Sequence, residues 1–338
     1  MPITLLLSAC TSSSSTAHHA PATAHTASPA PAGTPALTKP EALAQISRFS
    51  KVNNQAGPSG DRKLLDTVED GPLYAMSLSD IKQDAALPQA ARHPYRPWSY
   101  DLANTDVYIP RFTAGQPQWF AAVTYAGSDR AKARLLVMAE QVGTTRWEMV
   151  STVDIDSPKQ LPEIAVDGDG YATAVDTAAA GTLSVPVDAL RTAVLDNFST
   201  GGTTTGTTVF SPTTSSQRQI KVHDDTVGKF GTRGTTRFSP ARTEFPASYA
   251  LRTADGGALV VFAHTHIQRD AVARRGLAIM PDTEDRAWLG TKARPSFTYT
   301  FTCSDAATVP AAPGRATLIG YACRRTDATS GSSSSSAA

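Results

Sequence analysis

The chain shows the same order of sequence patterns twice: apolar residues at helical spacing, then several short apolar segments typical of strands. A helix is predicted over residues 40–54 in the first half and over residues 187–198 in the second. Strands are predicted over 107–112, 119–125, 133–142 and 147–155, and again over 249–253, 258–268, 297–303 and 317–324. The short connections between them favour antiparallel pairing. The sequence therefore predicts an α+β fold in two similar halves.

The closest local match between the halves joins residues 108–125 to residues 249–266. Each is a strand, a turn that contains glycine and a longer apolar strand, with Asp255-Gly256-Gly257 the stronger hairpin signal. This order resembles the cone-shaped fold of nuclear transport factor 2-like (NTF2-like) domains. In that fold helices pack into a curved antiparallel sheet and leave a pocket at its wide end.

The chain is also similar to a group of secreted actinobacterial lipoproteins of unknown function that carry two such halves. The resemblance implies two tandem NTF2-like domains, at residues 38–176 and 177–327.

Low-complexity segments flank the two halves. Residues 11–36 contain only Ser, Thr, Ala, Pro, Gly and three His, and residues 328–338 are again mostly Ser, Gly and Ala. Such segments cannot bury enough apolar surface to offset the entropy of an ordered chain. We expect a disordered tether over 11–37 and a disordered tail over 328–338.

The N-terminal residues 1–10 end in Leu7-Ser8-Ala9-Cys10, which resembles a bacterial lipobox. The resemblance implies a signal peptide that is cleaved before Cys10 and a cysteine that carries fatty-acyl groups such as palmitate. Such a protein is held at the extracellular face of the cytoplasmic membrane. No Lys or Arg precedes Lys39, so we expect the true start codon upstream of Met1.

The charges exclude one class of partner. The chain has 31 Lys and Arg against 30 Asp and Glu, and this balance argues against binding to nucleic acid or to a polybasic membrane surface. The expected partners are the membrane, through the lipid, and an envelope protein or a small-molecule ligand.

Cysteine use also favours export. Of the three cysteines, Cys303 and Cys323 remain as a pair once Cys10 is acylated. In an antiparallel hairpin centred near Pro313-Gly314 the two thiols lie almost opposite each other, so we predict a disulfide. The alternative is two buried free thiols.

Sequence motifs of known enzymes and metal sites are missing. The chain has no Gly-x-Ser-x-Gly, His-Glu-x-x-His or Cys-x-x-Cys sequence and no phosphate-binding loop. Asp167-Gly168-Asp169-Gly170 begins like a calcium loop, but Tyr171 and Ala178 stand where further ligands are required. A plain turn is favoured there, and no metal or cofactor is predicted.

Two histidines form the strongest cluster of candidate functional residues. His264 and His266 alternate on a predicted strand and share one face, and residues 223–225 (His-Asp-Asp) lie upstream. Together they could make a metal site or a general acid/base pair. Alternatively, Leu259 and its alternate neighbours fill the core face and both histidines point to solvent.

The first half offers aromatic candidates for a ligand pocket. Tyr108 and Tyr125 are the main candidates, with Arg111 as a clamp for an anion. Trp119 and Trp147 could line the same pocket. Aromatic residues on alternating strands also serve as ordinary core.

Two classes of function follow. A non-enzymatic, lipid-anchored protein that binds a ligand or a partner is favoured, and no reaction can be identified. The alternative is a small-molecule hydrolase or isomerase with its pocket in the C-terminal half.

Overall fold

The computed structural model describes residues 33–92, 94–126 and 130–331. Helices and antiparallel sheets occur together within them, so the predicted α+β class is confirmed. Cys10, most of the predicted tether and most of the predicted tail lie outside these residues. Regular structure nevertheless starts before residue 38 and ends after residue 327, because β1 (Thr34–Pro35) pairs with β3 (Arg111–Phe112) and the last strand ends at Gly331.

The first half places its helices before its sheet. Helix α1 (Lys39–Ala56) starts at a capping box, in which Thr38 and Glu41 satisfy each other's backbone N–H groups. Helices α2 (Arg62–Leu65) and α3 (Gly71–Ala86) follow. The sheet runs in the order β2-β4-β5-β6, with bounds β2 (Thr105–Tyr108), β4 (Trp119–Ala126), β5 (Lys132–Glu140) and β6 (Trp147–Ile155).

The second half repeats this order with longer strands. Its helices are α4 (Val187–Thr200), α5 (Gly206–Val209) and α6 (Thr214–Val227). Its strands are β7 (Gly234–Pro240), β8 (Ser248–Arg252), β9 (Ala258–Val272), β10 (Ser296–Val309) and β11 (Thr317–Gly331). The sheet order is β11-β10-β9-β7, and β8 shares the same edge of β9 with β7. The short α7 (Arg286–Leu289) lies between β9 and β10.

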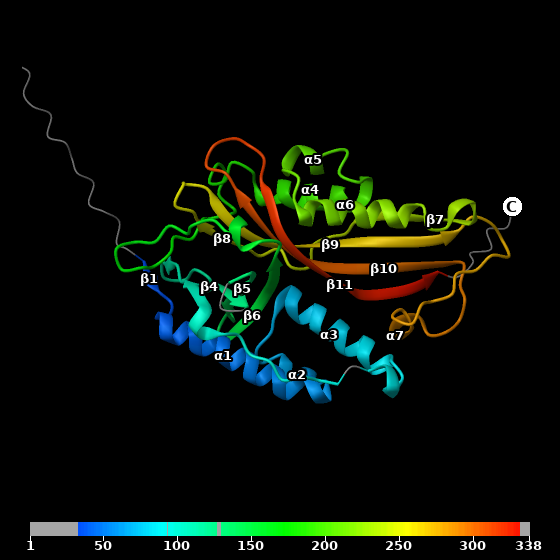
Figure 1. Cartoon of the computed structure of the whole chain (residues 1–338), viewed down its shortest axis with the longest axis horizontal. Coiled ribbons are helices and arrows are strands. Elements are labelled where there is room, and N and C mark those ends of the chain that lie inside the picture. Colours follow the sequence, from blue (N-terminus) through cyan, green and yellow to red (C-terminus); the bar gives the residue numbers. More distant parts are fainter. Residues whose placement is uncertain (1–32, 93, 127–129, 332–338) are drawn as a thin grey trace, which may run out of the picture. The chain divides into compact units, whose positions relative to one another are not determined.

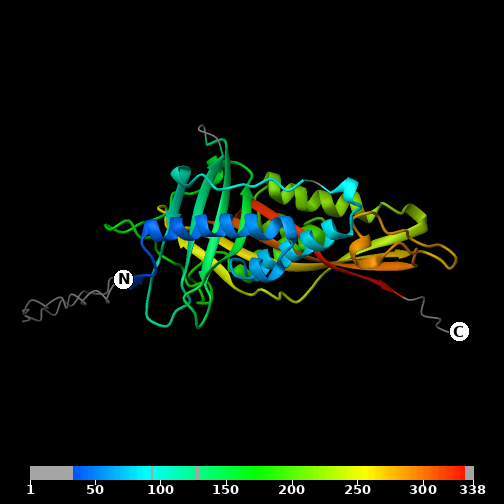
Figure 2. The same ribbon diagram turned by 90° about the horizontal axis from the view of Figure 1, so that it is seen from below.

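The two sheets pack face to face, and helices cover their outer faces. A shared core lies between the sheets, with Val123 and Leu135 from the first half and Leu259, Val261 and Ile319 from the second. A second core lies between α4 and the outer face of the longer sheet, and a third packs α1 on the shorter sheet. Figures 1 and 2 show α4 and α6 on one side of the long strands and α1 and α3 on the other. Strand β9 is consequently buried on both faces.

Strands β6 and β11 bring the two halves into direct contact. A Cβ atom at Gly320 would lie 2.4 Å from the carbonyl oxygen of Asp154, so glycine permits this approach. Beside it the Asp156 N–H donates to the Ile319 carbonyl at 2.8 Å. The Asp156 carboxylate accepts from the Ser215 N–H at 2.6 Å, in the first turn of α6. One aspartate thus joins both sheets and a helix.

Helices α3 and α6 and strand β7 were not predicted. The buried face of α6 consists of Ser215, Ser216 and Gln219, so its apolar residues give no helical period. The predicted strand 107–112 is divided into β2 and β3 because Pro110 stands between them and pairs with Ala172. None of the helices that the structure describes is long and apolar enough to cross a bilayer.

The predicted disulfide is present. Cys303 and Cys323 are direct partners on β10 and β11, their Cα atoms are 4.1 Å apart, and an S–S bond joins them. Cys303 is fully buried, whereas Cys323 is partly exposed.

The bond closes a loop of 20 residues, and the chain-entropy model gives such a loop about 3 kcal/mol of stability. We expect the variant Cys303→Ala/Cys323→Ala to lose about 3 kcal/mol of unfolding free energy, measured by urea denaturation against the oxidised wild type. The wild type reduced with a phosphine is the matched comparison. An unchanged midpoint in both samples would contradict the proposed contribution.

Candidate functional site

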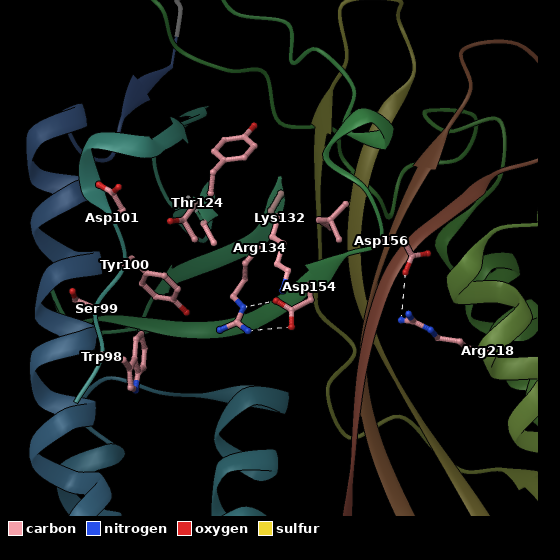
Figure 3. A pocket seen from close by; sticks show the side chains of 14 residues that line it. Trp98, Ser99, Tyr100, Asp101, Thr124, Lys132, Arg134, Asp154, Asp156 and Arg218 are labelled. Carbon is pink, nitrogen blue, oxygen red and sulfur yellow. Dashed lines mark hydrogen bonds and ion pairs between the residues drawn. The ribbon is translucent and has the colours of Figure 1, made fainter. Parts of the chain in front are cut away.

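Two adjacent cavities lie beside the shorter sheet. The larger has a volume of about 680 Å³ and the smaller about 340 Å³. Both are lined by Trp98, Tyr100, Arg134 and Asp154. We call the two cavities together the aromatic groove. Figure 3 shows the larger cavity, with Trp98 and Tyr100 on the side of α1 and Arg218 of α6 across from them.

One asparagine of α1 holds the aromatic wall of the groove. Asn54 Nδ2 donates to the Trp98 carbonyl at 2.6 Å, and Asn54 Oδ1 accepts from the Trp98 N–H at 3.0 Å. The same oxygen accepts from the Tyr95 hydroxyl at 2.7 Å. The irregular segment 94–101 is thereby fixed along α1 without secondary structure of its own.

Three rings form this wall. The centroids of Trp98 and Tyr100 are 5.0 Å apart in an edge-to-face arrangement. Phe49 of α1 lies 5.9 Å from Trp98 and stacks on Tyr100 at 6.3 Å. All three line the smaller cavity. Their rings give it an apolar, electron-rich side.

The opposite side of the groove is charged. Arg134 and Asp154 face each other across β5 and β6, and Arg134 donates to both carboxylate oxygens at 2.6 and 3.0 Å. This bidentate pair raises the pKa of Arg134. At the far side of the larger cavity, Arg218 lies 3.7 Å from Asp156.

Glu69 is a buried carboxyl group that lines the smaller cavity. It is 2% exposed; Oε1 accepts from Asn53 Nδ2 at 3.0 Å, and Oε2 has no hydrogen-bond partner among residues that the structure describes. Burial raises the pKa of Glu69 to about 7, although the nearby Ser77 hydroxyl and the Asn53 amide oppose this. Glu69 therefore titrates close to neutral pH.

Of the residues predicted from sequence, Tyr125 lines the larger cavity. The Arg130 guanidinium lies 3.6 Å from the centroid of the Tyr125 ring and pairs with Asp106 at 2.6 Å. Tyr108 packs against the core between the sheets, and burial raises its pKa to about 12. Tyr108 lines neither cavity of the groove.

The two predicted tryptophans are core residues. Trp119 lies in the core between the sheets and Trp147 in the core under α1. Neither lines the groove.

Arg111 lies away from the groove and is already neutralised. Its guanidinium bonds to Asp167 at 2.7 Å and to Asp169 at 2.5 Å, and it lies 4.6 Å from the centroid of the Tyr171 ring. The Asp167 carboxylate also accepts from the Asp169 and Tyr171 N–H groups. The 167–170 segment is thus a turn whose acidic residues meet an arginine, as the plain-turn interpretation expected.

His264 and His266 share one face of β9, but neither faces solvent. His264 is 0% exposed and His266 is 3% exposed, and both rings pack on Phe198 of α4 at centroid distances of 5.6 and 4.3 Å. Phe301 stacks on His266 at 5.0 Å. The alternative of solvent-facing histidines is wrong because α4 covers this face of the sheet.

The histidines end a buried chain of hydrogen bonds. Asn197 donates to Gln219 at 2.9 Å, and Gln219 donates to Asp305 at 3.1 Å. The other Asp305 oxygen lies 2.5 Å from His264 Nδ1, and His264 Nε2 lies 3.3 Å from His266 Nδ1. Burial and the neighbouring His264 hold the pKa of His266 well below its ordinary value. The carboxylate thus comes from β10, whereas His223 pairs with Asp224 on α6.

One spacing in this cluster suits a metal ion. The ring nitrogens of His264 and His266 and Cys303 Sγ lie within 4.8 Å of one another. The Cys303 sulfur is bonded to Cys323, so it offers no thiolate. The absence of a metal stays a prediction.

Sequence reasoning missed Trp98, Tyr100, Arg134, Asp154 and Glu69. One usable signal was the concentration of aromatic residues and prolines in segment 93–100, which has no helix or strand period. Asp305 could have been found, because it lies two positions after Cys303 and therefore on the same face of a strand.

Comparisons with known proteins identify relatives along most of the chain. The model of the domain described as "Domain of unknown function (DUF8094)" matches residues 33–330. An uncharacterized lipoprotein of Streptomyces coelicolor is 55% identical over 302 residues, which cover 89% of this chain and 85% of the relative. A second from that organism is 29% identical over 286 residues, covering 85% of this chain and 84% of the relative.

An uncharacterized lipoprotein of Streptomyces avermitilis is 27% identical over 277 residues, with 82% of this chain and 80% of the relative covered. No solved structure matches the chain. The expected similarity to actinobacterial lipoproteins of unknown function is confirmed.

The raised pKa of Glu69 predicts a pH-dependent stability. The folded state binds this proton more tightly than the unfolded state does, so Glu69 stabilises the fold fully below pH 4.5. This contribution is lost as the pH rises through about 7. We expect the unfolding free energy of Glu69→Gln to depend less on pH than that of the wild type. At pH 8 it should be higher than the wild-type value by on the order of 3 kcal/mol.

Urea denaturation at pH 5 and pH 8 measures this difference. A variant that is equally destabilised at both pH values would show that the Glu69 carboxyl is not desolvated in the folded protein.

Proposed function

The chain belongs to the family of the domain of unknown function DUF8094, and we propose that it is a lipid-anchored ligand-binding protein of the cell envelope, because the similar Streptomyces proteins are named lipoproteins. Its ligand, in this proposal, is a small molecule that occupies the aromatic groove. The carrying observation is that two adjacent cavities share the edge-to-face rings of Trp98 and Tyr100 and one bidentate ion pair.

The anchor in this proposal is acylated Cys10, which holds the chain at the extracellular face of the cytoplasmic membrane. The names of the relatives support a lipid anchor. The Cys303–Cys323 disulfide supports an oxidising compartment outside the cytoplasm.

We further propose that residues 38–176 and 177–327 are two NTF2-like repeats. Each half has helices first and then an antiparallel meander, and β4 takes the place in its sheet that β9 takes in the other. The outer face of each sheet carries its own helix. The repeats share the core between the sheets, where a pair of independent domains would show a polar boundary.

The groove suits a small molecule better than a protein surface. Ligand sites are concave and combine apolar surface with polar groups that orient the ligand. Here Phe49, Trp98 and Tyr100 supply the apolar side, and Arg134 with Asp154 supplies the polar one. Their positions are fixed by α1 and by two neighbouring strands.

The alternative, a hydrolase or isomerase with a pocket in the C-terminal half, has less support. His264 and His266 are buried under Phe198, and Phe301 stacks on His266. A substrate would have to displace these rings before it could reach either imidazole.

Native mass spectrometry of the full chain, extracted from membranes of its producing cells, tests the binding proposal. We expect an added small-molecule mass on the wild type that is lost from Trp98→Leu/Tyr100→Leu, because that variant removes the ring wall. Tyr171→Leu is the control, since the Tyr171 ring packs on Arg111 and lines neither cavity. Equal retention of the mass by the double variant would rule out the groove as the binding site.

The anchor is tested separately by labelling cells with a fatty-acid probe. Wild-type protein should carry the label and partition with membranes, and Cys10→Ala should do neither, because the acylated thiol is absent. A Cys10→Ala protein that still carries the label would contradict the assignment.

A further inference from the structure

We propose that the smaller cavity of the aromatic groove binds an ammonium group, met by the Glu69 carboxylate on one side and by the rings of Phe49, Trp98 and Tyr100 on the other. This inference rests on the proposed ligand-binding function and specifies the chemical class of the ligand. The class comprises protonated primary amines and quaternary ammonium compounds.

The charges around the cavity leave one anion without a partner. Asp154 is bound by Arg134 at 2.6 Å, and Asp80 of α3 is bound by Arg324 of β11 at 2.9 Å. Glu69, by contrast, meets only neutral donors, the Asn53 amide on Oε1 and the nearby Ser77 hydroxyl. When Glu69 is ionised, the cavity carries one unneutralised negative charge. A buried charge of this kind is costly until a cation pairs with it.

The ring wall provides the second element of cation recognition. Aromatic faces attract cations, and this attraction is stronger at sites removed from water. Phe49, Trp98 and Tyr100 contact one another and line the same cavity as Glu69. A cavity lined by both a carboxylate and aromatic rings selects a cation over a neutral molecule of the same shape.

The volumes fit a ligand larger than its ammonium group. The smaller cavity, of about 340 Å³, accommodates the charged group with a short carbon chain. Trp98 and Tyr100 also line the larger cavity. The remainder of a longer amine would pass along these rings into the larger cavity.

Glu69 ionisation should couple ligand binding to pH. The polar groups that face it are Asn53 from α1 and Ser77 and Asp80 from α3, with the Arg134–Asp154 and Arg324 groups on the same cavity. Its pKa of about 7 in the empty cavity means that roughly half the molecules carry the proton at pH 7. A bound ammonium group favours the carboxylate, so binding releases a proton.

Isothermal titration calorimetry with choline and 2-phenylethylamine tests the inference on the purified chain. The neutral analogue of choline, 3,3-dimethylbutan-1-ol, is the matched ligand control. We expect at least one of the two cations to bind at pH 8 and the alcohol to bind at least tenfold more weakly. At pH 5.5 the affinity of that cation should fall by roughly 30-fold, because the protonated fraction of Glu69 rises.

Variants then test whether binding depends on the Glu69 carboxylate itself or on any buried carboxyl group. Glu69→Gln should weaken binding of the cation at least tenfold at pH 8, and Trp98→Leu should weaken it several-fold. Glu148→Gln should bind as the wild type does. Glu148 is the matched control, because it is also a buried carboxyl with a pKa raised to about 7, yet it pairs with Arg146 at 2.6 Å and lines neither cavity.

Three results would overturn the inference: neither cation binds, the alcohol binds as tightly as choline, or Glu69→Gln retains full affinity. Melting curves establish that each variant is folded. If the mass retained in native mass spectrometry belongs to a neutral or anionic molecule, the groove remains the ligand site and only the ammonium assignment fails.

Discussion

The packing of one sheet on the other determines the rest of this structure. Apolar residues of both sheets meet in one core, and α4 and α1 cover the outer faces of the two sheets. Gly320 of β11 lies so near Asp154 of β6 that a Cβ atom would not fit between them. Asp156, two residues further on, binds both the neighbouring strand and the start of α6. Arg218, one turn further along α6, lines the larger cavity of the groove.

The groove occurs where regular packing ends. Arg134 and Asp154 pair across β5 and β6 with side chains that are 43% and 72% exposed, and a segment without secondary structure lines the same cavities beside them. The turn before α3 carries Glu69 to the same place, where its backbone bridges to Met149 of β6. Rigid strands thus position the charged groups, and an irregular segment supplies the rings. This division is common in ligand sites, in which loops carry specificity on a fixed scaffold.

The sequence was sufficient for the elements whose burial follows a simple period. The apolar stripe of α1 with Ala42, Ile46 and Phe49 is visible in the sequence, and so is the pairing of Cys303 with Cys323. The sequence pattern did not predict α6, because this helix buries serine and glutamine. It also did not predict that both faces of β9 are buried. A strand that lies between a sheet and a helix has no face toward solvent. The alternation of side chains along β9 therefore led to the alternative in which His264 and His266 face solvent.

The groove itself could not be read from the sequence, because its parts are distant in the chain and share no pattern. Trp98 and Tyr100 lie far from Phe49 and Glu69, and only the folded arrangement of α1, α3 and β5 brings them together. Burial raises the pKa of Glu69, and the burial of a single glutamate cannot be recognised from the sequence.

The attachment of segment 94–101 to α1 bears on how quickly the groove can exchange its contents. The wall is fixed near its middle by the side chain of Asn54, which binds both backbone groups of Trp98. Strand separation is not required to move it, since these bonds belong to a single amide. Opening of this wall is then a local event, with a barrier set by a few hydrogen bonds and ring contacts rather than by unfolding of a sheet. The groove thus has one side built on paired strands and another held by a few side-chain bonds.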